Sequence, residues 1–87
     1  MNAHEQAQAA VHHSLRVAFD NEELEFGPTD RLQHDLGLDS MTFLHLALDL
    51  ETFLQGPLGE QPDQLPQTVS DLVDLVTRRL EDRSHVA

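Results

Sequence analysis

Apolar side chains recur at helical spacing in three separate segments of the chain, and this spacing limits the possible folds more than any other feature. In residues 40–54 one set follows positions i, i+3, i+4, i+7 and i+11, which places it on one face of an α-helix. Similar spacing occurs in residues 1–19 and 68–82. The pattern therefore predicts an all-α bundle of three long helices that each bury one face. The side chains expected to face the core are Val11, Leu15, Ala18, Phe19, Phe43, Leu46, Ala47, Leu50, Leu54, Val69, Leu72, Val73, Val76 and Leu80.

Two loops separate the predicted helices. Residues 20–39 start with polar residues and contain turn-forming residues at 26–30, so they are expected to form a long first loop. Apolar side chains spaced through this loop are expected to pin it onto the helices, and they are Leu24, Phe26, Leu32, Leu36 and Leu38. Residues 55–67 are expected to be loop with at most one short helical turn, because Pro62 can start such a turn and Pro66 would end it.

The charge balance limits the possible partners. The chain has 87 residues, with 16 acidic and 5 basic side chains and a formal net charge of −11. A chain of this length is expected to form one domain, residues 1–87, with a modest core. Such an acidic surface repels nucleic acid backbones and favours partners with basic patches. The sequence has no cysteine, no basic-then-apolar leader and no apolar run of about 20 residues, so we expect a cytoplasmic monomer without a membrane span.

The turn before the second predicted helix delivers a serine to the first helical position. Gly37 can take a positive φ angle without steric strain, which suits a sharp chain reversal. Asp39 is a suitable N-cap, because its carboxylate can accept hydrogen bonds from free N–H groups one turn into the helix. Ser40 then lies beside the positive end of the helix, where a phosphodiester on its hydroxyl group is favoured.

The residues around this serine resemble the attachment site of a prosthetic group in acyl carrier proteins. The string that carries the resemblance is Leu32-x-x-Asp35-Leu36-Gly37-x-Asp39-Ser40-Met41. The resemblance implies a small acyl-carrier-type bundle of three long helices plus one short helix or turn, with a long first loop. It also implies that Ser40 carries a covalent 4′-phosphopantetheine arm from coenzyme A, on which acyl groups are held as thioesters. Asp39, next to the acceptor, would help to place the enzyme that attaches the arm.

The second predicted helix has an additional apolar stripe beside its core-facing one. Met41, Leu44 and Leu48 follow positions i, i+3 and i+7, and burying a whole helix is difficult in so small a domain. We therefore assign this stripe to partner contact, and the family resemblance adds Glu51. The expected partners are a phosphopantetheinyl transferase and acyl-loading, condensing and acyl-transfer enzymes with basic docking patches.

One departure from the family pattern lies early in this helix. Carriers of fatty acid synthesis usually place acidic residues after the serine, whereas this chain has Thr42 and His45 there. The acids that remain in the helix after the serine are Asp49 and Glu51. His45 removes one negative charge from the surface that a basic partner would contact, so it is a candidate for setting partner choice. The departure favours a specialised pathway, such as polyketide or other secondary metabolism, over general fatty acid synthesis.

Other functions stay open at this point. A peptidyl or aminoacyl carrier shares the fold and the arm, but Asp39 and the strong acidity count against it. An unmodified helical interaction module would keep the fold and carry nothing. An enzyme is the least favoured class, because His12 and His13 point to different faces of a helix and Ser40 has no base at a sequence-defined position. The aspartates do not follow the spacing of a calcium-binding loop, so no metal site is expected.

Overall fold

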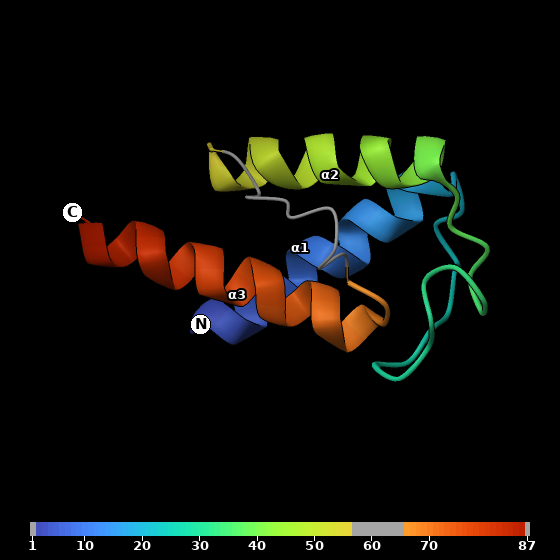
Figure 1. Ribbon diagram of the computed structural model, residues 1–87, viewed down its shortest axis with the longest axis horizontal. Helices are drawn as coiled ribbons and strands as arrows, with labels where there is room; N and C mark the ends of the chain where they lie inside the picture. The colour runs from blue at the N-terminus through green and yellow to red at the C-terminus, as the bar shows by residue number, and fades with distance from the viewer. Residues whose placement is uncertain (1, 57–65, 87) are drawn as a thin grey trace.

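The computed structural model describes residues 2–56 and 66–86, and three helices account for most of them (Figure 1). Helix α1 spans Ala3–Ala18, α2 spans Ser40–Leu54 and α3 spans Val69–Val86. The described part of the chain is therefore all-helical, as the apolar spacing predicts. The prediction for the end of α3 was wrong: the helix continues past residue 82, because neither glycine nor proline interrupts the polar residues there. The short helical turn expected between Pro62 and Pro66 involves residues outside those described.

Each helix begins at a side chain that accepts a hydrogen bond from a free backbone N–H group. Asn2 caps α1, with Oδ1 accepting from the Glu5 N–H at 2.8 Å. Thr68 and Asp71 form a reciprocal capping box at α3: the Asp71 N–H donates to Thr68 Oγ1 at 3.1 Å, and the Thr68 N–H donates to Asp71 Oδ2 at 3.2 Å. The spacing of Thr68 and Asp71, three residues apart, is the sequence pattern of a capping box, whereas the cap at Asn2 was not foreseen.

Helix α1 makes most of the contacts between helices in the bundle. It packs against both α2 and α3, whereas α2 and α3 contact each other much less. In Figure 1, α2 and α3 run in roughly the same direction and α1 runs in the opposite direction behind them. The faces of α2 that do not meet α1 or α3 are consequently left to the loops and to solvent.

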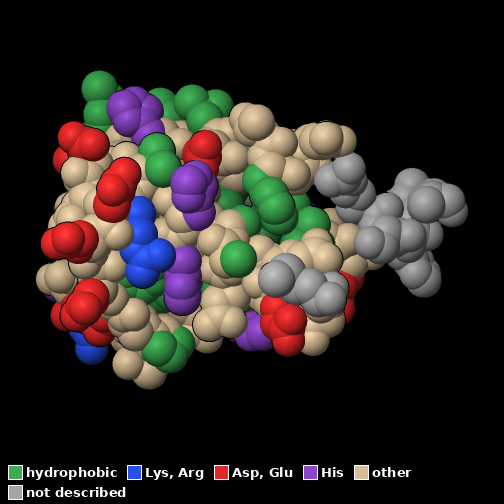
Figure 2. Space-filling view, turned by 180° about the vertical axis from the view of Figure 1, so that it is seen from behind, with side chains coloured by type: hydrophobic (Ala, Val, Ile, Leu, Met, Phe, Trp, Pro, Cys, Tyr) green, Lys and Arg blue, Asp and Glu red, His purple; other side chains and the backbone are tan. Residues whose placement is uncertain are grey.

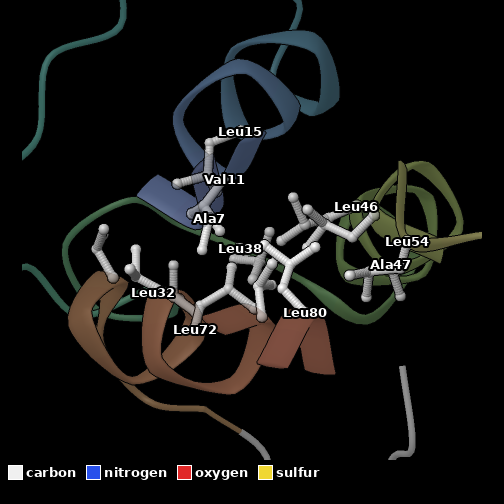
Figure 3. Packing of buried hydrophobic residues seen from close by; sticks show 14 residues of the cluster. Ala7, Val11, Leu15, Leu32, Leu38, Leu46, Ala47, Leu54, Leu72 and Leu80 are labelled. Atoms are coloured by element: carbon white, nitrogen blue, oxygen red, sulfur yellow. The ribbon is translucent and has the colours of Figure 1, made fainter. Parts of the chain in front are cut away.

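The core consists of apolar side chains from all three helices and the first loop, which point toward one another (Figure 3). Burial of one leucine or valine side chain contributes about 1.5–3 kcal/mol. Three predicted core residues are only partly buried at the edge of this cluster: Ala18, Phe19 and Phe43. They occupy the last turn of α1, its C-cap and the first turn of α2, where fewer elements cover a side chain. The buried residues are Ala7, Val11, Leu15, Leu32, Leu38, Leu46, Ala47, Leu50, Leu54, Val69, Leu72, Val73, Val76 and Leu80.

The first loop connects to the start of α3 through backbone hydrogen bonds. The Leu32 N–H donates to the Gln67 carbonyl at 2.8 Å, the Val69 N–H to the Asp30 carbonyl at 3.0 Å and the Ser70 N–H to the Pro28 carbonyl at 2.9 Å. The first N–H groups of a helix have no partner within the helix. Loop carbonyls therefore supply the partners that the first turn of α3 needs. We refer to these three bonds as the loop–α3 ladder.

Apolar side chains of the loop also pack onto the helices. Leu32 and Leu38 are buried, while Leu24, Phe26 and Leu36 are partly buried against the core. The rings of Phe26 and His12 of α1 meet edge to face with their centroids 4.8 Å apart, and the Arg16 guanidinium lies 5.5 Å from the Phe26 centroid. Arg16 Nε also donates to the Leu24 carbonyl at 3.2 Å. These contacts hold the early part of the loop on α1.

Candidate attachment site at the start of helix α2

The turn that precedes α2 depends on a glycine with a positive φ angle. Gly37 has a φ of 74°, and a Cβ atom built on it would meet no atom within 4 Å. Glycine is thus required here by the backbone conformation and not by lack of space. The next residue, Leu38, is buried and its N–H donates to the Leu32 carbonyl at 2.8 Å. With Leu38 anchored inward, the chain emerges at the surface at Asp39.

Asp39 caps α2 as the sequence predicts. Its Oδ1 accepts from the Thr42 N–H at 2.8 Å, and its carbonyl accepts from the Phe43 N–H at 2.8 Å. Hydrogen bonds from Thr42, together with one from Met41, hold the pKa of the Asp39 carboxyl below its ordinary value. Asp39 is therefore ionised at neutral pH and stays committed to the cap.

Ser40 is the first residue of α2 and is exposed to solvent. Within the described residues, its hydroxyl group takes part in no hydrogen bond. It is therefore an accessible hydroxyl at the positive end of a helix dipole, held on a capped and regular turn. Chemically, this position suits an acceptor for a phosphorus-containing group, because the dipole stabilises an anion there.

The additional stripe of α2 lies on the surface. Met41 is 68 % exposed, and Leu44 and Leu48 are each 53 % exposed. We call these three residues the outer stripe. His45 is exposed next to it, and Glu51 is half-buried. Figure 2 shows hydrophobic side chains along the upper edge of the molecule, where α2 lies, and acidic side chains gathered to one side of them.

Two exposed apolar side chains were not predicted from the sequence. Val17 of α1 is 55 % exposed and Phe53 of α2 is 40 % exposed. The signal for Val17 was available, because it lies outside the core-facing spacing of α1. The structure also joins Ser14 of α1 to Asp49 of α2 by a side-chain hydrogen bond. No spacing rule relates two residues so far apart in sequence, so this contact needed the structure.

The described residues contain neither a metal-binding cluster nor a membrane-spanning helix. No three histidine or acidic side chains gather there in a way that could hold a metal ion. No described helix is long and apolar enough to cross a membrane. No family model matches the sequence, and comparisons with curated proteins and with solved structures found no similar chain.

Proposed function

We propose that this chain is an acyl carrier protein that holds acyl groups as thioesters on a 4′-phosphopantetheine arm attached to Ser40. The observation that carries the proposal is the exposed Ser40 hydroxyl at the start of α2, directly after the Asp39 cap and the Gly37 turn. The three-helix arrangement supports an acyl-carrier-type bundle. The resemblance of residues 32–41 to the family's attachment site supplies the identity of the arm.

A phosphopantetheinyl transferase would attach the arm from coenzyme A. The Ser40 oxygen forms a bond to the phosphorus that bears pantetheine, the bond from that phosphorus to the nucleotide phosphate breaks, and the serine proton passes to a base of the transferase. In such transfers positioning and electrostatic stabilisation supply most of the catalysis. The chain contributes an accessible acceptor hydroxyl, and Asp39 fixes the helix turn that presents it. The chemistry of the thioester belongs to the arm, while the protein presents it to enzymes.

Docking of partner enzymes is assigned to the outer stripe with Glu51 and His45. Exposed apolar groups of this extent on a small protein usually mark contact surfaces. The net charge of −11 favours enzymes with basic patches around an apolar centre. The partners would include the transferase and acyl-loading, condensing and acyl-transfer enzymes.

The attachment site is tested by Ser40→Ala. After incubation with coenzyme A and a broad-specificity transferase, the wild-type chain should gain the mass of phosphopantetheine, whereas Ser40→Ala should not. Ser70→Ala, which also removes a serine hydroxyl near a helix start, serves as the matched control and should gain the full mass. A wild-type chain that gains no mass would favour the unmodified interaction module. Loading of the modified chain by aminoacyl ligases but not by acyl ligases would favour a peptidyl carrier.

The specialised pathway is tested at His45. His45 is exposed beside the outer stripe, where carriers of fatty acid synthesis often have an acid. His45→Glu restores a negative charge, so it should increase the rate of malonyl loading by a fatty acid malonyl transferase. The two proteins must be matched for phosphopantetheine content and compared by circular dichroism. Indistinguishable loading rates would show that His45 has no part in partner choice.

A further inference from the structure

A hollow of about 420 Å³ lies between α1 and α2. Hollows of this size are within the range of sites that hold small ligands or inserted side chains. Its main lining residues are Ser14, Val17, His45, Leu48, Asp49 and Thr52. Leu48 also belongs to the outer stripe, so the hollow is continuous with the surface assigned to partners.

The two sides of the hollow are apolar at the surface. Val17 of α1 is 55 % exposed and Leu48 of α2 is 53 % exposed. A long side chain inserted between them would cover apolar surface on both helices. The methylene stems of arginine and lysine cover such surface while their charged ends reach polar groups.

The polar groups of the hollow offer mainly hydrogen-bond acceptors. Ser14 is buried and its hydroxyl donates to Asp49 Oδ2, while the Thr52 hydroxyl donates to the Leu48 carbonyl at 3.1 Å. A hydroxyl group has a single proton to donate, so both protons are already used. Asp49 Oδ1 has no hydrogen-bond partner among the described residues. Apart from His45, the side chains lining the hollow therefore have acceptor sites to offer and no donor.

We propose that this hollow binds an arginine side chain of a partner enzyme. The stem lies between Val17 and Leu48, and the guanidinium donates to Asp49 Oδ1 and Thr52 Oγ1. Arginine fits better than lysine, because its planar group presents several N–H donors at once and is more weakly hydrated. The acidity of the whole chain adds charge complementarity. The inference rests on the proposed function, since it names a contact made by the carrier's enzymes.

A capped amino acid tests the chemistry of the hollow without any enzyme. N-acetyl-arginine methylamide is titrated into the isotope-labelled chain, with the citrulline analogue as an uncharged probe of the same shape. The arginine probe should shift backbone amide signals of residues 14–18 and 45–52, and the citrulline probe should not. Equal responses to the two probes, or shifts spread over the acidic surface, would overturn the proposal.

Matched variants separate the hollow from general acidity. Asp49→Asn keeps an oxygen that can accept from Ser14, and it should weaken arginine binding about tenfold, as expected for loss of a charged hydrogen bond. Asp74→Asn removes the same charge from an exposed position of α3 and should leave binding unchanged. Val17→Ala removes part of the apolar wall and should weaken binding without affecting the fold. Equal weakening by Asp49→Asn and Asp74→Asn would contradict the assignment.

The transferase assay distinguishes failure of this inference from failure of the proposed function. With saturating coenzyme A, Asp49→Asn and Val17→Ala should raise the KM for the carrier, whereas Asp74→Asn should not. Normal KM values for all variants, together with no arginine binding, would contradict the assignment of the hollow as an arginine site without contradicting the carrier function. Absence of any modification at Ser40, with arginine binding intact, would overturn the carrier function and leave the chemistry of the hollow standing.

Discussion

Leu48 and Leu50 lie two positions apart on α2 and have opposite surroundings. Leu50 is fully buried, whereas Leu48 is 53 % exposed. Leu50→Ala should lower the free energy of unfolding by about 2–5 kcal/mol, because it leaves a cavity in the core. Leu48→Ala should change it by no more than about 0.5 kcal/mol, as is usual for surface substitutions. Urea unfolding of both variants measures the difference, and equal losses would mean that the two faces of α2 are wrongly assigned.

The spacing of apolar residues predicts the direction of a side chain around a helix better than its depth. Leu50 and Phe43 share the core-facing spacing of α2, yet only Leu50 is fully buried. Depth depends on which other elements cover a position, and Phe43 lies in the first turn of its helix. The hydrogen bond from Ser14 to Asp49 was unpredictable for the same reason, since it requires the relative placement of α1 and α2.

At the scale of elements, contact between the first loop and α1 should depend on pH. Burial, and then the charge of Arg16, lower the pKa of His12 below its ordinary value of 6.5. In the unfolded chain His12 binds a proton at higher pH than in the folded one, so the stabilisation is present above pH 6.5 and is lost as the pH falls through the folded pKa. Acidification should therefore weaken the contact of His12 with Phe26 and destabilise the fold.

Removal of the imidazole tests this dependence. Urea unfolding is measured for the wild-type chain and His12→Gln at about pH 7.5 and about pH 5.5, on either side of the ordinary histidine pKa. The wild type should lose more stability between the two conditions than the variant. His13→Gln, at an exposed neighbouring position, is the matched control and should behave as the wild type. Equal pH dependence in wild type and His12→Gln would show that His12 does not couple the loop to protonation.

The starts of the helices could be predicted more accurately than the end of the last one. The caps at Asp39 and Thr68 are local devices, in which one side chain meets an N–H group three residues along. A sequence shows such pairs directly. The C-terminal end of α3 has no comparable signal, because polar residues such as Glu81 and Asp82 are compatible both with a helix and with the segment that follows one.

At the scale of the whole molecule, the acidity should accelerate encounters with basic enzymes. The charge of −11 attracts them over a Debye length of about 10 Å at about 0.1 M salt, which shrinks to about 3 Å at about 1 M. The kcat/KM of the transferase for the carrier should therefore fall as salt is added. A double variant, Glu22→Gln with Glu23→Gln, removes two exposed charges and should show a shallower dependence. A rate that stays constant across this range would exclude electrostatic steering.

The order of the three long helices in the described residues could be predicted, but their arrangement could not. Periodicity is local, so residues 40–54 identify α2 without knowledge of the rest of the chain. Helix α1 contacts both of the other helices. This arrangement depends on how apolar faces that are far apart in sequence pack together, which a local pattern does not predict. The loop–α3 ladder is made of backbone groups, so the residue types of the sequence do not predict it.

The loop–α3 ladder closes a circuit of chain that contains the whole of α2. The amide hydrogens of Leu32, Val69 and Ser70 are held in this ladder and exchange with solvent only when it opens. Opening would also leave N–H groups in the first turn of α3 without their carbonyl partners. Opening of the ladder and fraying of this turn are therefore coupled. These amides should thus exchange slowly and at similar rates, as members of one cooperative unit. The segment that presents Ser40 is therefore closed at its two ends by hydrogen bonds that open together.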